Sequence, residues 1–383
     1  MKVLVLNVGS STCKCWFQDM PGGEIVTARA EWKWSENGEE KIDALIRSLP
    51  FLADVQMVGH RIVHGGPKYR ESVLITPEVR AGIAALEEFA PAHNKLELAS
   101  IETVERAIGK HVPQVAVFDT GFHATLAPRA FVYPGPYGWL GEGVRRYGFH
   151  GISVQYSTRR AGEILGEPDG LRLIVCHLGN GASVTAVANG KSVDTSMGFT
   201  PLEGLMMGTR SGSIDPSILV YLMRRGAGAD DLDYILNRES GLLGVSGITG
   251  DMRELLQAIE RGSERARLAY EIYAHRLTRE IGAMLGVLRG ADAVVFTGGI
   301  GENCVPLRRD VCAQFEFLGL QLDPAKNACP ELDQNIAAAG SKIQALVIRA
   351  DEDSQIAREC LRIHSGQASG QASGQASEQP ARA

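Results

Sequence analysis

The chain has 383 residues, more than a single hydrophobic core usually serves, so we expect two domains. Its net charge is −6, from 39 basic and 45 acidic side chains, and this mild acidity argues against a nucleic-acid-binding protein, which usually carries a basic face. No stretch reaches the roughly 18 consecutive apolar residues of a membrane span, and the N-terminus has no signal-peptide pattern. We therefore expect a cytoplasmic protein with no nucleic-acid or membrane partner.

The first part of the chain predicts a β-hairpin followed by helices and a strand. Apolar runs at 2–6 and 13–17 flank a polar Gly/Ser turn at 7–12, which is typical of a hairpin. Helical spacing follows at 76–89 and 95–108, and the apolar run at 115–118 predicts a buried strand that ends on Asp119.

A second hairpin begins far downstream. Apolar runs at 171–176 and 183–188 flank a Gly-containing turn, and Asn189-Gly190 predicts a tight turn into 191–195. Two such hairpins, each opening one half of the chain, indicate an internally duplicated fold. The longest helical stretch lies at 263–288, and a strand at 293–296 leads into a Gly-rich turn at 297–301. This alternation of strands and helices is typical of an α/β protein.

Two further features concern the chain as a whole. Seven cysteines are scattered without a CxxC pair, so we interpret them as small buried hydrophobes and not as a metal site, even at Cys13 and Cys15. The segment 365–383 repeats Gly-Gln-Ala-Ser and lacks core-forming residues, which predicts a flexible, low-complexity tail.

Three Gly-rich turns are the candidates for phosphate binding. The chain has no P-loop of the form GxxxxGK[ST] and no GxGxxG after a strand. The turns at 7–12, 177–182 and 297–303 each follow a strand, and such turns expose backbone N–H groups that suit phosphate oxygens. An ordinary hairpin turn is the alternative for each of them.

Six motifs, in order, resemble those of the acetate kinase (acetokinase) family. They are NVGSS at 7–11, GHRIVHGG at 59–66, YGFHG at 147–151, HLGNG at 177–181, MGFTPLEGLMMGTRSG at 197–212 and TGGIGEN at 297–303. The resemblance covers about 3–363, and the run at 197–212 is its most specific part.

The resemblance implies a duplicated actin-like ATPase (ribonuclease H-like) fold, with the active site in the cleft between two domains. We expect the N-terminal domain at 1–123 with 355–364, the C-terminal domain at 124–354, and the tail beyond. The implied activity is the reversible, ATP-dependent phosphorylation of acetate or propionate to an acyl phosphate and ADP. The implied cofactor is Mg²⁺, with Mn²⁺ as an alternative, and the implied assembly is a homodimer.

The chemistry explains why these residue types would be needed. A carboxylate substrate is already ionised at neutral pH, so no general base is required. The enzyme must instead offset repulsion between two anions and stabilise charge on the transferring phosphoryl group, which arginine, histidine and Mg²⁺ do.

By resemblance, each role falls on particular residues. Those expected to act in catalysis are Arg61, Asp119, His150 and Arg210. Those expected to bind the carboxylate substrate are Arg61, Val63, Ala92, His93, Phe149 and Pro201. Those expected to contact the nucleotide are Asn7, Ser10, Lys14, His177, Gly179, Asn180, Gly181, Asp251, Arg253, Gly298, Gly299, Gly301 and Asn303. Asn7 and Glu352 are expected to hold the metal, largely through water, with Asp119 assisting.

Several positions depart from the family pattern, among them Thr12, which replaces a serine in the first turn. Acetate-selective members carry a leucine where this chain has Ala92, so a longer acyl chain is expected to fit. Val154 replaces a histidine, and Ser213 stands where an aspartate commonly follows TRSG.

Two other functions share features with this sequence. An exopolyphosphatase or sugar kinase of the same fold would aim a carboxylate at water or a hydroxyl and would lack the paired arginines. A non-catalytic ATP-binding scaffold would lack Arg210 or His150, which are present here. A kinase of the same family that prefers propionate or butyrate is the third alternative.

Overall fold

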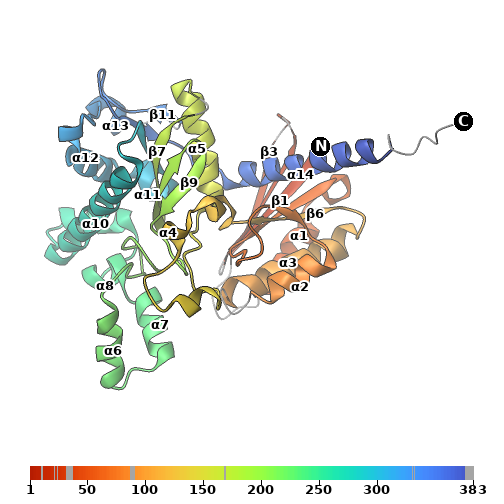
Figure 1. Cartoon of the computed structure of the whole chain (residues 1–383), viewed down its shortest axis with the longest axis horizontal. Coiled ribbons are helices and arrows are strands. Elements are labelled where there is room, and N and C mark those ends of the chain that lie inside the picture. The colour runs from red at the N-terminus through yellow and green to blue at the C-terminus, as the bar shows by residue number, and fades with distance from the viewer. Residues whose placement is uncertain are drawn as a thin grey trace, which may run out of the picture. The chain divides into compact units, whose positions relative to one another are not determined.

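The structure is a computed structural model that describes residues 1–9, 12–20, 22–23, 25–31, 38–86, 91–167, 170–329, 331 and 333–375. The chain forms two units, Met1–Gly121 with Asp351–Ala383, and Phe122–Ala350. The expected boundaries, at 123 and 355, differ from these by two and four residues. Figure 1 labels many of the elements of both units.

A six-stranded sheet forms the centre of the N-terminal unit. Its strands are β1 (Lys2–Val8), β2 (Thr12–Asp19), β3 (Ile25–Glu31), β4 (Met57–Ile62), β5 (Val73–Leu74) and β6 (Gln114–Phe118). Their order is β3-β2-β1-β4-β6-β5. Strands β1 and β2 pair antiparallel, which confirms the predicted hairpin, whereas β4 runs parallel to both β1 and β6.

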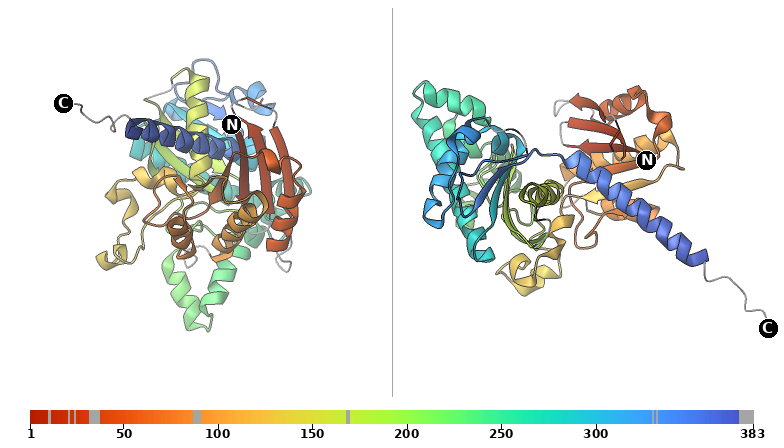
Figure 2. Two further views of the ribbon diagram at one scale, coloured as in Figure 1. Left: turned by 90° about the vertical axis from the view of Figure 1, so that its right-hand side faces the viewer. Right: turned by 90° about the horizontal axis from the view of Figure 1, so that it is seen from above.

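Helices cover both faces of this sheet. They are α1 (Gly38–Ser48), α2 (Pro77–Ala84), α3 (Pro91–Ile108) and α14 (Glu352–Gln375), with a short turn η1 (Leu52–Asp54). Apolar side chains of α1 and α3 pack with those of β1 and β2 into one core. On the other face, a Cβ at Gly59 of β4 would lie 2.5 Å from Ile356 of α14, so the glycine allows this helix to pack directly on the strand. Figure 2 shows α14, in blue, beside the red strands.

The C-terminal unit repeats this plan. Its strands are β7 (Arg172–Leu178), β8 (Ala182–Ala188), β9 (Lys191–Thr195), β10 (Ala293–Thr297), β11 (Gln334–Asn335) and β12 (Gln344–Val347). The order β9-β8-β7-β10-β12 matches β3-β2-β1-β4-β6, with the same parallel and antiparallel pairs. The predicted duplication is therefore confirmed. Asn189 and Gly190 both have positive φ (51° and 71°), as the predicted tight turn requires.

Helices also cover both faces of the second sheet. They are α4 (Pro128–Phe131), α5 (Gly151–Leu165), α6 (Pro216–Arg224), α7 (Ala229–Arg238), α8 (Gly241–Ser246), α9 (Met252–Glu260), α10 (Glu264–Leu288), α11 (Gly298–Asn303), α12 (Val305–Ala313) and α13 (Pro324–Ala328). Short 3₁₀ turns lie at η2 (Gly121–Thr125), η3 (Tyr137–Leu140) and η4 (Glu316–Leu318). Side chains of α5 pack against β7 and β10, and α10 packs against β7 and β8. Among the described residues, no helix combines the length and apolarity that a membrane crossing needs.

Two predictions about local structure were wrong. The Gly-rich segment after β10 is the short helix α11, which Gly298 makes possible because its φ of 77° turns the chain out of the strand. The tail was expected to be irregular from 365, but α14 continues to Gln375. Buried Ile356 and Cys360 anchor the first turns of this helix. Once a helix has begun, each further residue that is fixed adds a hydrogen bond, so extending the helix is easier than starting it.

Candidate functional site

Three predicted residues lie at one edge of the N-terminal sheet. Asn7 lies near the end of β1, Arg61 near the end of β4, and Asp119 directly after β6. Because these three strands run parallel, their carboxyl ends meet at the same edge, which is where open α/β sheets usually bind ligands. Glu352, the first residue of α14, joins them.

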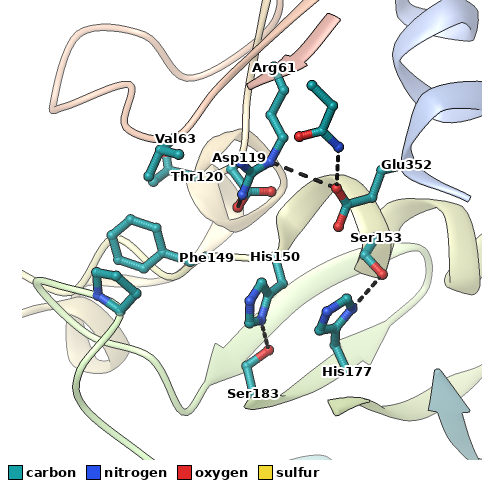
Figure 3. Close-up of polar contacts among 12 residues, drawn as sticks. Arg61, Val63, Asp119, Thr120, Phe149, His150, Ser153, His177, Ser183 and Glu352 are labelled. Atoms are coloured by element: carbon teal, nitrogen blue, oxygen red, sulfur yellow. Dashed lines mark hydrogen bonds and ion pairs between the residues drawn. The ribbon is translucent and has the colours of Figure 1, made fainter. Parts of the chain in front are cut away.

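Charged contacts link this group. Arg61 Nη2 lies 2.9 Å from Asp119 Oδ2, and Arg61 Nε lies 3.8 Å from Glu352 Oε2. Asn7 Nδ2 donates to the same Glu352 oxygen at 3.1 Å. Figure 3 shows these contacts around Arg61. Burial acts to lower the pKa of Arg61, but Asp119, Glu352 and Glu97 together outweigh it and raise that pKa, so the guanidinium stays charged.

This edge fits a magnesium ion held mainly through water. Glu352 and Asp119 supply carboxylate oxygens and Asn7 an amide oxygen, which are the ligand types that Mg²⁺ prefers. Across the part of the chain that the structure describes, no cluster of three or more His, Cys, Asp or Glu side chains could hold a metal. Magnesium needs only one or two carboxylates when it also binds phosphates, so this sparse donor set is sufficient.

Glu97 is a residue of this unit that the sequence analysis missed. It lies on α3, is 1% exposed, and its Oε1 accepts a hydrogen bond from the Val63 N–H at 3.1 Å. Burial raises its pKa from 4.5 to about 8, against the opposing effects of Arg61 and the Val63 N–H. A glutamate in a helix normally faces water, so the sequence gives no sign that Glu97 is buried. Its burial follows only from the packing of α3 on the sheet.

The remaining predicted residues of this unit are placed as follows. Val63 is buried directly after β4, and Lys14 lies on β2 opposite Asn7 with its side chain exposed. The backbone of Ala92 and His93 belongs to the first turn of α3, but their side chains lie outside the described part, as does Ser10.

In the C-terminal unit, His150 and Arg210 converge beside Gly181. A Cβ at Gly181 would lie 3.3 Å from His150 Nε2 and 3.3 Å from Arg210 Nη1, so both groups reach the same small space. Arg210 Nη1 also donates to the Pro201 carbonyl at 3.3 Å. Burial and the nearby Arg238 lower the pKa of Arg210, and among the described residues it has no ion-pair partner. An anion suits the space beside Arg210, whose guanidinium has no ion-pair partner among the described residues.

The ring of His150 is held from two sides. Its Nδ1 lies 3.0 Å from Ser183 Oγ, and its ring stacks on that of His177 with centroids 4.2 Å apart. His177 Nδ1 in turn lies 2.7 Å from Ser153 Oγ. Figure 3 shows these two serine–histidine pairs, with Phe149 preceding His150. When the Ser183 hydroxyl donates to Nδ1, the proton of the neutral imidazole lies on Nε2, which can then donate to a ligand oxygen.

The backbone of His150 is strained. Its φ of 59° and ψ of 20° lie in the left-handed region, and it is the N-cap residue of α5, with no side-chain capping hydrogen bond. Such conformations cost roughly 1–3 kcal/mol for a residue other than glycine and cluster at functional sites. Phe149, 2% exposed, anchors the preceding position.

A cavity of about 750 Å³ lies in the same unit. Its volume is within the usual range for small-molecule sites, roughly 300–1,000 Å³. Of the residues predicted to contact nucleotide, those that line it are Gly179, Asn180, Asp251, Arg253, Gly299 and Asn303. The residues that complete its wall but were not predicted are Gly250, Met252, Leu256, Ile300 and Cys304. Met252 and Leu256 lie four residues apart on α9, a spacing that places both on one helix face and could have identified them.

The other nucleotide-contact residues predicted in this unit do not line the cavity. His177 lies on β7, and Gly181 lies beside His150 and Arg210. Gly298 permits the sharp exit from β10, since a Cβ there would lie 2.9 Å from the Leu178 carbonyl oxygen. Gly301 is buried in α11, where a Cβ would lie 3.3 Å from the backbone of Phe296.

The two sequence departures in this unit have local roles. Val154 is fully buried and belongs to the apolar core under α5, where a histidine would need a hydrogen-bond partner. Ser213 Oγ accepts from the Gly204 N–H at 2.9 Å, which an aspartate oxygen could also do.

Comparison with known proteins gives matches along most of the chain. The model of the acetokinase family matches residues 39–358. An acetate kinase of Gloeobacter violaceus is 49% identical over 399 positions, covering 94% of this chain and 98% of that protein. The crystal structure of Porphyromonas gingivalis acetate kinase superposes with a TM-score of 0.86 at 38% identity, over 94% of this chain and 99% of its own. A propionate kinase from Francisella tularensis also gives 0.86, at 35% identity and the same coverage.

Proposed function

Because the chain belongs to the acetokinase family, we propose that it transfers the γ-phosphoryl group of ATP to the carboxylate of acetate, giving acetyl phosphate and ADP. It has the duplicated actin-like ATPase fold of that family, with the same strand plan in both units. The observation that carries the proposal is the convergence of Arg210 and His150 beside Gly181, with no carboxylate paired to Arg210 among the described residues.

The chemistry asked of the residues is electrostatic. The carboxylate oxygen attacks phosphorus, the bond to the β-phosphate oxygen breaks, and negative charge spreads over the three equatorial oxygens. Arg210 and His150 Nε2 would donate to those oxygens, while Arg61, held by Asp119, would oppose the charge of the incoming carboxylate. No side chain has to remove a proton, because the nucleophile is already an anion.

Magnesium and nucleotide complete the proposal. Asn7, Asp119 and Glu352 would hold Mg²⁺, which when bound neutralises part of the charge on the β- and γ-phosphates. The cavity between α9 and α11 would take the adenosine, since Met252, Leu256 and Ile300 offer it an apolar wall. Use of ATP supports the cytoplasm as the compartment in which the protein acts.

The test is formation of acyl hydroxamate from ATP, Mg²⁺, acetate and hydroxylamine. An acetokinase gives a ferric-hydroxamate colour that depends on both ATP and acetate. A phosphohydrolase of the same fold would release phosphate without any hydroxamate, and an ATP-binding scaffold would do neither. EDTA should abolish the colour and added Mg²⁺ should restore it, while Mn²⁺ is expected to substitute.

The length of the acyl chain is the finer question, and Ala92 bears on it. Compared with leucine, alanine removes three carbons from the wall expected to face the alkyl end of the acid. One buried methylene contributes about 0.8 kcal/mol, so pockets of this type discriminate by about 10- to 200-fold at most. We therefore propose that propionate is used at least as well as acetate.

The matching prediction is that Ala92→Leu shifts the preference back to acetate, mainly through a higher KM for propionate. kcat and KM for acetate, propionate and butyrate would be compared in both proteins. A wild type that strongly favours acetate, together with an unchanged ratio in the variant, would remove Ala92 from specificity and leave the kinase activity intact.

We further propose that the protein is a homodimer and that α6 contributes to the interface. Four large apolar side chains of this short helix are between 44% and 56% exposed, namely Ile218, Val220, Tyr221 and Met223. None of the residues of α6 is buried. Four large apolar side chains exposed on one nine-residue helix favour a contact with another protein.

A further inference from the structure

The strained backbone at His150 requires something to hold it. Three other described residues that are not glycine have a positive φ, namely Asn189, Arg289 and Asp333. Asn and Asp tolerate the left-handed region, and Arg289 ends a helix, where this conformation is common. His150 instead is the N-cap of α5, and its side chain makes no capping hydrogen bond that would stabilise the conformation.

His123 supplies a hydrogen bond at this point. Its Nε2 lies 2.9 Å from the carbonyl oxygen of Phe149, the residue directly before His150. A carbonyl oxygen only accepts, so Nε2 carries the proton and donates. On the other side of the ring, Nδ1 lies 2.9 Å from Ser192 Oγ on β9. The His123 ring is 1% exposed, so both bonds are shielded from water.

The chain packs directly on this ring. Gly148 has a φ of 77°, and a Cβ there would lie 2.7 Å from two ring carbons of His123. The N–H groups of Tyr147 and Gly148 both donate to the Gly198 carbonyl, at 3.0 and 3.2 Å. The turn that leads into His150 is therefore held by the His123 ring and by Gly198, and the peptide between Phe149 and His150 has limited freedom to rotate.

We propose that His123 is a positioning residue for phosphoryl transfer: by holding the Phe149 carbonyl, it keeps His150 in the conformation that brings Nε2 beside Arg210. The inference rests on the proposed role of His150. It explains why a polar ring is buried away from the reacting groups, with one nitrogen on the backbone of the turn and the other on a neighbouring strand.

The first test compares two replacements of His123. Phenylalanine keeps the ring shape and removes the donor, whereas the amide nitrogen of glutamine can take the place of Nε2 and still donate to the carbonyl. Since a misplacement of about 1 Å can cost about 100-fold in rate, His123→Phe should lower kcat by about that factor with KM for ATP little changed. His123→Gln should recover most of the loss. Equal losses in both variants would contradict the proposal.

A double-mutant cycle separates positioning from a general structural role. If His123 acts through His150, then His123→Phe should have no further effect on kcat in a His150→Ala background. If His123→Phe lowers kcat by a similar factor in both backgrounds, His123 supports the structure of the unit as a whole and does not act through His150. If the phenylalanine variant does not fold, Ser192→Ala in the same two backgrounds decides by the same criterion, because it frees the Nδ1 side of the ring.

A readout besides activity keeps this inference distinct from the kinase proposal. With ¹⁵N-histidine labelling, the His150 ring resonances, assigned by their absence in His150→Ala, should shift or split in His123→Phe and return in His123→Gln. His275→Phe, an exposed control on α10, should leave them unchanged. Absence of hydroxamate from the wild type would refute the kinase function, whereas unchanged His150 resonances in His123→Phe would refute the positioning role.

Discussion

Arg61 and Arg210 differ in what surrounds them, and this difference predicts different effects when each is replaced. Arg61 is paired with buried Asp119, whereas Arg210 has no ion-pair partner among the described residues. Replacing either by alanine should lower kcat by about 10³-fold, as for other arginines that stabilise a transferring phosphoryl group. Only Arg61→Ala should also lower Tm, because it removes the ion-pair partner of a buried carboxylate.

These variants are checked by hydroxamate kinetics and by thermal unfolding. Arg261→Ala, which removes an exposed arginine after α9, serves as the control for both measurements. Near-normal kcat in a folded Arg210→Ala protein would remove that residue from the mechanism.

Glu97 gives the protein a stability that depends on pH. Its folded pKa, about 8, lies above the ordinary value of 4.5 because the side chain is buried. Between these two values the folded state binds more protons than the unfolded state, so the free energy of unfolding falls as pH rises through this window. The full contribution is present below pH 4.5 and is lost above 8, with a size on the order of a few kcal/mol.

The Glu97→Gln variant should therefore have a higher Tm than the wild type near pH 8.5, and this difference in Tm should become smaller toward pH 5. The glutamine still accepts from the Val63 N–H, so that contact is retained. Glu102→Gln, an exposed change on the same helix, should show no such trend in thermal melts across the same range. If Tm depends on pH in the same way in Glu97→Gln and in the wild type, the carboxyl of Glu97 is not buried and neutral as described.

At the scale of elements, both hairpins and the longest helix could be predicted from the sequence, whereas α11 and most of α14 could not. The strands β7, β8 and β9 follow from apolar runs and Asn189-Gly190, and α10 follows from its period and begins at the cap residue Ser263. α11 was missed because three glycines in six residues predict a turn, whereas packing against β7 and β10 stabilises a helix there. Local propensity is weak in segments this short, and tertiary contacts decide.

The candidate site shows the same division. Asp119 follows a predicted strand, so the sequence places it at a sheet edge. Arg61 was identified only through its motif and lies within β4. Glu97 and His123 were missed because their roles come from contacts 34 and 26 residues away, with Val63 and Phe149, which no local pattern encodes.

The last helix gives a prediction at the same scale. Among the side chains of α14 that the structure describes, the buried ones lie between Gln355 and Cys360, and the Gly-Gln-Ala-Ser repeats lie beyond them. Deleting 365–383 should therefore leave kcat and Tm nearly unchanged, although the structure extends the helix to Gln375. A Tm lowered by several degrees in differential scanning calorimetry would show that the end of α14 stabilises the fold.

At the scale of the whole molecule, the exposed apolar side chains of α6 are expected to control assembly. Placing a charge within a buried apolar contact is costly, so Tyr221→Glu with Met223→Glu should convert a dimer into monomers. Light scattering after size exclusion gives the mass directly. Phe317→Glu, at an apolar residue 80% exposed in η4, should leave the mass unchanged. Dimers that persist in the α6 variant would place the interface elsewhere.

The return of α14 to the N-terminal unit has a consequence for synthesis on the ribosome. The C-terminal unit is one continuous stretch, Phe122–Ala350, and can complete its core as soon as that stretch has emerged. The N-terminal unit, although made first, lacks the helix that packs on Gly59 until α14 has been translated, after the whole of the C-terminal unit. For most of translation one face of its sheet is therefore uncovered, which makes this unit, and not the later one, the natural client of a chaperone.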